Sequence, residues 1–87
     1  MMSIDDRVDV VFVNAATGEE GEAEVPVDVS CTQIVAELQK VKFIPTGPTK
    51  FALEVEGGNQ IRPTTTLREA GVTPGTRLIV APEPVGG

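Results

Sequence analysis

The sequence predicts an α+β fold in which one main helix packs across a mixed β-sheet, with elements in the order β-β-α-β-β-β. Three observations predict it. Two early segments have the residue pattern of strands, the next segment has the period of a helix, and short strand-like segments occupy the remainder. The chain has 87 residues, the size of one small domain. A single apolar helical face can be covered by one sheet.

The amino-terminal third is predicted to form a β-hairpin. Residues 8–14 are β-branched and almost continuously apolar, which is typical of a buried central strand. Residues 15–21 have the composition of a turn, and residues 22–29 alternate between apolar and polar side chains. Because Pro26 has no N–H to donate to a neighbouring strand, we expect this second strand at a sheet edge.

The main helix is predicted to begin after Ser30. Ser30 and Gln33 have the spacing of a capping box, which satisfies free backbone N–H groups at a helix start. The expected apolar stripe on one helical face consists of Ile34, Val35, Leu38 and Val41. The helix should end by about Lys42, because the proline- and glycine-rich residues 45–49 cannot continue it.

The carboxyl-terminal half is predicted to contain three short strands and a helical turn. Residues 50–56 alternate, and the side chains on their apolar face are those of Phe51, Leu53 and Val55. A glycine-rich turn at 57–59 leads to a short strand at 60–62. A helical turn at 66–71 precedes a last strand at 78–80. This order of elements is the β-grasp architecture.

The composition argues against catalysis and nucleic-acid binding. There is no histidine, so the commonest general base and metal ligand is missing, and the single cysteine, Cys31, has no histidine partner. We therefore expect no catalytic residue, no metal site and no enzyme activity. Residues 1–30 hold eight acidic residues and one basic residue, a charge that repels nucleic acid.

No apolar run approaches the ~20 residues that a membrane-spanning helix needs. We expect a cytoplasmic monomer with three segments: a flexible segment at 1–7, a folded domain at 8–81 and a flexible tail at 82–87. Proline in the tail fixes φ and favours an extended backbone. Glycine has no Cβ, so the pair Gly86-Gly87 can enter a channel too narrow for other residues.

Several of these segments resemble the ubiquitin family. Gly57–Ile61 is similar to a hairpin of that family, Thr66-Leu67 to the start of its short helical turn, and Ile44-Pro45 to the Ile-Pro after its helix. Gly86-Gly87 falls on the terminal diglycine of that family. The resemblance covers about residues 8–87 and implies a ubiquitin-like β-grasp. We expect a divergent member from a bacterial ubiquitin-like conjugation system.

The resemblance implies a protein modifier whose conjugation site is Gly86 and Gly87. An E1-like enzyme would use ATP to adenylate the Gly87 carboxylate, and an E2-like carrier would hold it as a thioester. The carboxylate would then form an isopeptide bond with a target protein, and a deconjugating protease would release it. The chain would need no cofactor of its own. The tail residues that would contact the two enzymes are Pro82, Glu83, Pro84 and Val85.

The resemblance also implies a partner surface at Val55, Ile79 and Ala81, although the alternation of residues 50–56 allows Val55 to face the core instead. The candidate acceptors for self-conjugation are the three lysines, Lys40, Lys42 and Lys50. Glu83 stands where ubiquitin has an arginine that helps to select the activating enzyme, so the partner enzyme should differ from the eukaryotic one.

Two other functions remain open. One is a sulfur carrier that resembles the small β-grasp partners of thiamine or molybdopterin synthesis and ends in a thiocarboxylate. The other is a β-grasp interaction module, such as a secretion or oxygenase accessory subunit, whose tail has no chemical role. Loss of function on deletion of Gly87 would favour the modifier or the sulfur carrier over the interaction module.

Overall fold

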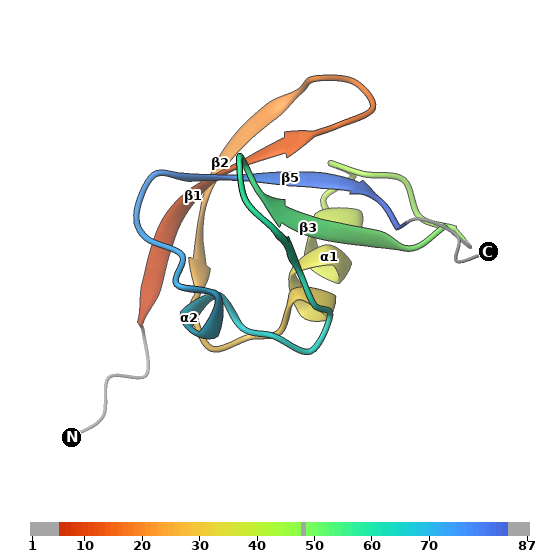
Figure 1. Cartoon of the computed structure of the whole chain (residues 1–87). Coiled ribbons are helices and arrows are strands. Elements are labelled where there is room, and N and C mark those ends of the chain that lie inside the picture. Colours follow the sequence, from red (N-terminus) through yellow and green to blue (C-terminus); the bar gives the residue numbers. More distant parts are fainter. Residues whose placement is uncertain (1–5, 48, 84–87) are drawn as a thin grey trace.

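The structure, a computed structural model, describes residues 6–47 and 49–83. One mixed sheet and a helix that packs across it form the fold (Figure 1). The strands are β1 (Arg7–Asn14), β2 (Glu20–Pro26), β3 (Phe51–Val55), β4 (Gln60–Ile61) and β5 (Thr76–Pro82). The helices are α1 (Cys31–Lys40) and α2 (Leu67–Ala70). The predicted β-grasp architecture and the order of its elements are confirmed.

The sheet has the strand order β2-β1-β5-β3-β4. β1 and β5 are parallel neighbours, with Phe12 opposite Leu78, and the other neighbouring pairs are antiparallel. β2 lies at an edge, as Pro26 predicted. The first and the last strand of the chain therefore lie side by side in the interior of the sheet (Figure 1).

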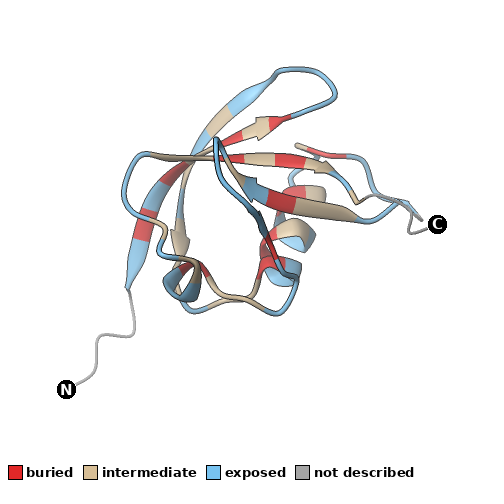
Figure 2. Ribbon diagram, viewed as in Figure 1, coloured by how far each residue is buried: buried red, intermediate tan, exposed pale blue. Residues whose placement is uncertain are grey.

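Alternation along the strands separates a buried inner face from an outer face (Figure 2). In β1, Val8, Val10 and Phe12 point inward, and in β5 Leu78 and Val80 do the same. The residues between them point to the outer face, away from α1. The turn predicted at 15–21 is shorter than expected, because β2 begins at Glu20, which pairs with Val13.

Helix α1 begins where the sequence predicts. The Ser30 side chain accepts a hydrogen bond from the Gln33 N–H at 3.4 Å. Ile34 and Leu38 are buried, but Val41 is 69% exposed, so its assignment to the apolar stripe is wrong. The physical reason is that the helix ends at Lys40 and the chain turns at Lys42, whose φ is 65°.

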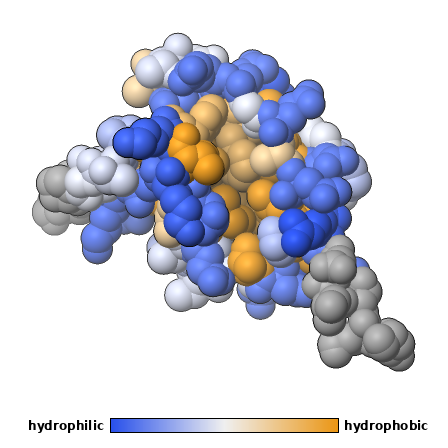
Figure 3. Space-filling model, turned by 180° about the vertical axis from the view of Figure 1, so that it is seen from behind, coloured by the Kyte–Doolittle hydropathy of each residue, from blue (hydrophilic) through white to orange (hydrophobic). Residues whose placement is uncertain are grey.

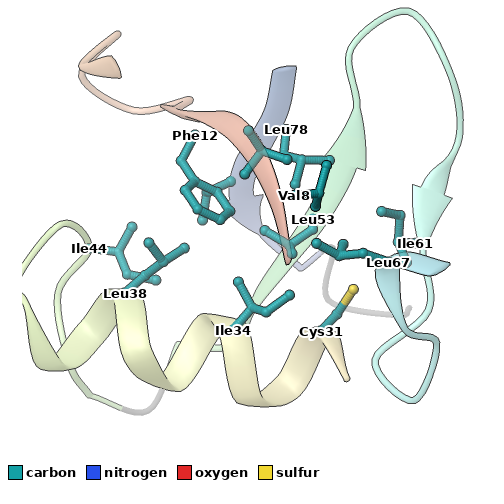
Figure 4. Packing of buried hydrophobic residues seen from close by; sticks show 12 residues of the cluster. Val8, Phe12, Cys31, Ile34, Leu38, Ile44, Leu53, Ile61, Leu67 and Leu78 are labelled. Atoms are coloured by element: carbon teal, nitrogen blue, oxygen red, sulfur yellow. The ribbon is translucent and has the colours of Figure 1, made fainter. Parts of the chain in front are cut away.

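The side chains between sheet and helix form a single core. On the face of the molecule opposite to that of Figure 1, hydrophobic side chains remain in view at the centre, with hydrophilic ones around them (Figure 3). Inside, side chains of α1 point toward those of the strands and of α2 (Figure 4). The buried apolar residues are Val8, Val10, Phe12, Cys31, Ile34, Leu38, Ile44, Leu53, Ile61, Leu67, Leu78 and Val80.

Helix α2 contacts Asp6, the residue that precedes β1. Thr66 forms a capping box with Glu69, and Gly71 ends the helix with a φ of 76°, a conformation that favours glycine. The Arg68 guanidinium donates to the carboxylates of Asp28 and Asp6, each at 2.7 Å. Asp6 also accepts from the Val27 N–H through its backbone oxygen. Asp6 and Arg7, which fall in the segment expected to be flexible at 1–7, therefore contact the fold, and residues 1–5 lie outside the described residues.

Candidate partner-binding surface

The outer face of the sheet carries an apolar strip. In the parallel pair β1–β5, Val13 lies opposite Ile79, and in the antiparallel pair β3–β5, Ala52 lies opposite Ala81. Because opposite residues share a face, these side chains form one surface on the side away from α1. We call it the outer strip; its half-buried residues are Val11, Val13, Ala52, Ile79 and Ala81.

The structure brings together only two of the three residues expected to form a partner surface. Ile79 and Ala81 lie on the outer strip, but Val55 lies opposite Leu78, which is fully buried on the inner face. Val55 packs against the core. The period of two in β3 therefore separates Val55 from the outer strip, as the alternation with Leu53 allowed.

Charged residues share the outer face with the outer strip: Glu54 lies opposite Ile79 in the β3–β5 pair, and Arg77 lies opposite Val11 in the β1–β5 pair and links three strands or strand ends. Arg77 precedes Ile79 by two residues and so points to the same face. Its guanidinium contacts the Glu20 carboxylate at 2.7 Å and the Glu56 carboxylate at 3.1 Å. The hydrogen bond from Arg77, and then its charge, lower the pKa of Glu20 below its ordinary value. Arg77 and its two carboxylate partners thus form a charged group beside the apolar side chains of the outer strip.

The beginning of the expected tail belongs to the sheet. Pro82 pairs with Phe51, and the Glu83 N–H donates to the Lys50 oxygen at 2.8 Å. The expectation that the tail begins at residue 82 is therefore wrong. In this antiparallel register, the hydrogen-bonded pair is Glu83 with Lys50, so the ring nitrogen of Pro82 points away from β3 and no ladder bond is lost. The remaining expected tail residues, Pro84, Val85, Gly86 and Gly87, lie outside the described residues.

The three lysines all lie at the surface. Lys40 is in the last turn of α1, where its Nζ lies 3.5 Å from the Glu37 carboxylate. Lys42 follows the helix, and Lys50 precedes β3. Their exposure makes each amine accessible.

Cys31, at the start of α1, is buried and 2% exposed. Burial raises the pKa of its thiol to about 11, because a thiolate there would lose its hydration. The thiol is therefore protonated at neutral pH, which makes it a poor nucleophile.

We expect the Cys31 thiol to react with a soluble aromatic disulfide reagent at least about a hundredfold more slowly in the native protein than in denaturant. Because the folded pKa lies above the ordinary value of 9.0, the stabilising effect of the protonated thiol should be complete below pH 9 and be lost as the pH rises through about 11. Alkaline unfolding of Cys31→Ala should lack this component. Equal reaction rates in the folded and denatured protein would contradict the burial.

Within residues 6–47 and 49–83, no group of three or more His, Cys, Asp or Glu residues is arranged to hold a metal ion. Across the same residues, no helix is long and apolar enough to cross a membrane.

Sequence reasoning missed Val11, Val13 and Ala52 in the outer strip. Residues 8–14 were expected to be buried on both faces, so the partial exposure of two valines was not anticipated. The only sequence signal is the apolar character of alternate positions, which indicates cover on both faces but not its source. The pairing of β1 with β5 decides which residues share a surface, and it joins segments more than 60 residues apart.

The strand order and the helix across the sheet define a ubiquitin-like β-grasp. Several solved structures share it. The Caldiarchaeum subterraneum ubiquitin is 24% identical, with a TM-score of 0.72 over 94% of this chain and 100% of that chain. A designed protein based on ubiquitin is 21% identical, with a TM-score of 0.73 over 92% of this chain and 93% of that chain.

A match to a protein family identifies the chain more narrowly than the shared fold does. Residues 7–80 match the family described as WXG100 protein secretion system (Wss), protein YukD, and the chain belongs to this family. A chain of protomer 1 of the ESX-3 core complex is also similar in structure; it is 22% identical, with a TM-score of 0.74 over 94% of this chain and 17% of that chain. No match was found among curated proteins.

Proposed function

We propose that this protein is a non-covalent interaction module of a WXG100-type secretion system, docked on a partner subunit through the outer strip. The observation that carries the proposal is the family match, which runs from the start of β1 to Val80 in β5 and so spans almost all of the β-grasp. In this function the chain catalyses no reaction, needs no cofactor and acts in the cytoplasm.

The ESX-3 similarity supports the same proposal. There, a chain several times longer contains a part with this fold, within a core complex of a secretion system. A β-grasp that is one part of a large subunit is positioned by contacts with its neighbours. We propose that the present chain makes comparable contacts as a separate protein, and that the half-buried side chains of the outer strip become fully buried in them. Burial of apolar side chains supplies the main favourable free energy of such association.

The test replaces Ile79 at the centre of the outer strip. In cells that depend on a copy of this gene, Ile79→Asp should reduce secretion of the system's WXG100 substrate at least about tenfold, because a buried, unpaired carboxylate weakens an apolar interface. Ile79→Ala should have a smaller effect in the same direction. Thr64→Asp introduces the same charge in an exposed loop and should leave secretion unchanged.

The thermal unfolding of each variant should be compared with that of the unchanged protein, so that loss of docking is distinguished from loss of fold. If Ile79→Asp folds normally and secretion persists, docking through the outer strip is wrong.

A second function, favoured by the sequence feature Gly86-Gly87, is that of a covalent modifier. An E1-like enzyme would adenylate the Gly87 carboxylate, and the product would be an isopeptide bond to a target or, in a sulfur carrier, a thiocarboxylate. In this proposal Glu83 continues the pairing of β5 with β3, so the reactive end would extend from a fixed point on the sheet.

Deletion of Gly87 separates the two functions. Secretion should be unaffected if the protein is a docking module, whereas a modifier or carrier should become inactive. Intact mass spectrometry of protein from its own cells gives an independent readout. Adducts that join Gly87 to lysines of other proteins would establish a modifier, and a gain of about 16 Da, the replacement of oxygen by sulfur, would establish a carrier.

A further inference from the structure

A second surface lies on the inner side of the sheet, on the face opposite to the outer strip. Between β2 and α1 the fold leaves an open groove of about 640 Å³. The hydrophobic area in Figure 3 lies on this side of the molecule. Mostly apolar side chains line it, namely Ala23 and Val25 of β2, Ile34 and Leu38 of α1, Phe12 of β1 and Val29 before α1. We call it the β2–α1 groove.

The edge of β2 beside this groove is unpaired in the described sheet, where β2 has β1 as its one neighbour. The Val27 N–H donates to the Asp6 oxygen, and the Asn14 N–H donates to the Glu19 oxygen. In an antiparallel ladder the hydrogen-bonded residues alternate, so the odd-numbered residues of β2 direct their backbone groups to β1. The backbone N–H and C=O groups of Glu20, Glu22 and Glu24 therefore point away from the sheet, where another strand can bind them.

The two faces of β2 specify what an added strand should contain. Ala23 and Val25 point into the groove, while Glu22 and Glu24 are exposed on the outer face. A strand paired with β2 would place every second side chain over the groove, where small β-branched residues fit. The intervening side chains would lie beside the glutamates, where basic residues form favourable cross-strand pairs.

The charge around β2 indicates whether the added strand comes from a different protein or from a second copy of this chain. Asp9 lies opposite Glu24 on the outer face, and Glu37 of α1 lines the groove on the inner side, so acidic side chains flank the edge of β2 on both faces. Two copies paired through β2 would bring their glutamates opposite one another, which is unfavourable. Arg7 is the basic residue among those that line the groove, and it lies opposite Pro26 at one end. A basic extended segment of another protein therefore fits the edge of β2 better than the β2 strand of a second copy does.

We propose that β2 and the β2–α1 groove bind an extended segment of a partner protein by strand addition, with β-branched residues over the groove and lysine or arginine beside Glu22 and Glu24. Main-chain hydrogen bonds would supply affinity, and the alternate side chains would supply specificity. Pro26 has no N–H, so it sets the limit of the added strand at one end. This site is independent of the proposed docking through the outer strip, and each can fail without the other.

The test uses a synthetic peptide, acetyl-Lys-Val-Lys-Val-Lys-Val-Lys-amide, and NMR spectra of the full chain. The expected result is that amide signals of β2 and α1 shift, and that the Glu22 and Glu24 amides exchange more slowly with solvent, because they become hydrogen-bonded. The affinity should fall as salt is added. The same peptide with glutamate in place of lysine should bind at least about fivefold more weakly.

Variants of Glu22 separate charge from backbone bonding. Glu22→Gln removes the charge alone and should weaken binding about twofold. Glu22→Pro also removes an N–H that the β1 ladder does not use, and should weaken binding a further 2- to 10-fold. Glu54→Lys is the matched control: Glu54 is also exposed on the outer face of a strand, but it does not border the groove, so Glu22→Lys should weaken binding far more than Glu54→Lys.

Three results would overturn the proposal. They are peptide-induced shifts confined to the outer strip, equal affinity for the basic and acidic peptides, and dimerisation of the protein through β2 in sedimentation experiments. If Glu22→Pro does not fold, Glu22→Gln and the acidic peptide still decide the question. Failure of the unchanged protein to bind the basic peptide would exclude this site alone and would leave docking through the outer strip untouched. Ile79→Asp should bind the peptide as the unchanged protein does, because Ile79 does not line the groove.

Discussion

Replacement of Leu53 by alanine is expected to lower the free energy of unfolding by about 2–5 kcal/mol. Leu53 is fully buried in β3, opposite Val80 on one neighbouring strand and Ile61 on the other. Truncation would remove apolar burial and leave a space that the two flanking strands cannot close without breaking their register. The measurement is equilibrium unfolding in urea, from the midpoint and slope of the transition.

The matched control is Val41→Ala. Val41 is also a large aliphatic residue, but it is 69% exposed, so its truncation should change stability by less than about 0.5 kcal/mol. Similar effects for the two substitutions would mean that the core is placed incorrectly.

The second large effect is expected at Asn14, the one described polar residue whose side chain is buried. Its Nδ2 donates to the Phe43 oxygen at 3.1 Å, and its Oδ1 accepts from the Ala16 N–H at 2.9 Å. Asn14→Ala would leave both backbone groups without this partner and should lower the free energy of unfolding by about 2–3 kcal/mol. Thermal unfolding should show a clear decrease in Tm.

Asn59→Ala provides the comparison, because Asn59 is exposed in the turn between β3 and β4. Its effect should be below about 0.5 kcal/mol. Should Asn14→Ala prove as stable as the unchanged protein, water must satisfy the Phe43 and Ala16 groups, and the two Asn14 hydrogen bonds would contribute little to stability.

The elements whose signals are local could be predicted from the sequence. Ser30 and Thr66 begin helices because their side chains accept from N–H groups three residues ahead, and that spacing is visible in the chain. The period of two at 51–55 predicted which side chains of β3 face the core. Strand ends were less accurate, since pairing extended β5 from Thr76 to Pro82 although neither end carries a strong strand signal.

The candidate surfaces could be predicted only in part. Ile79 and Ala81 came from the resemblance to ubiquitin, and their position on one face agrees with the register of β5. The other side of the strip comes from β1, and no local pattern states that Val13 lies opposite Ile79. The β2–α1 groove was missed for the same reason: its apolar lining residues have ordinary core signals, and the gap arises only from the separation of two elements.

The adjacency of β1 and β5 has a consequence for the order of folding during synthesis. β1 can pair with β2 as soon as both strands leave the ribosome, but its other edge has no native neighbour until β5, the last strand, has been made. Until then one edge of β1 in the nascent hairpin is unpaired and open to misassociation. The contacts between β1 and β5 are among the most distant in the chain, which slows folding as contact order rises. A stalled or truncated chain that lacks residues 76–82 should therefore be a substrate for chaperones and proteases rather than a smaller working domain.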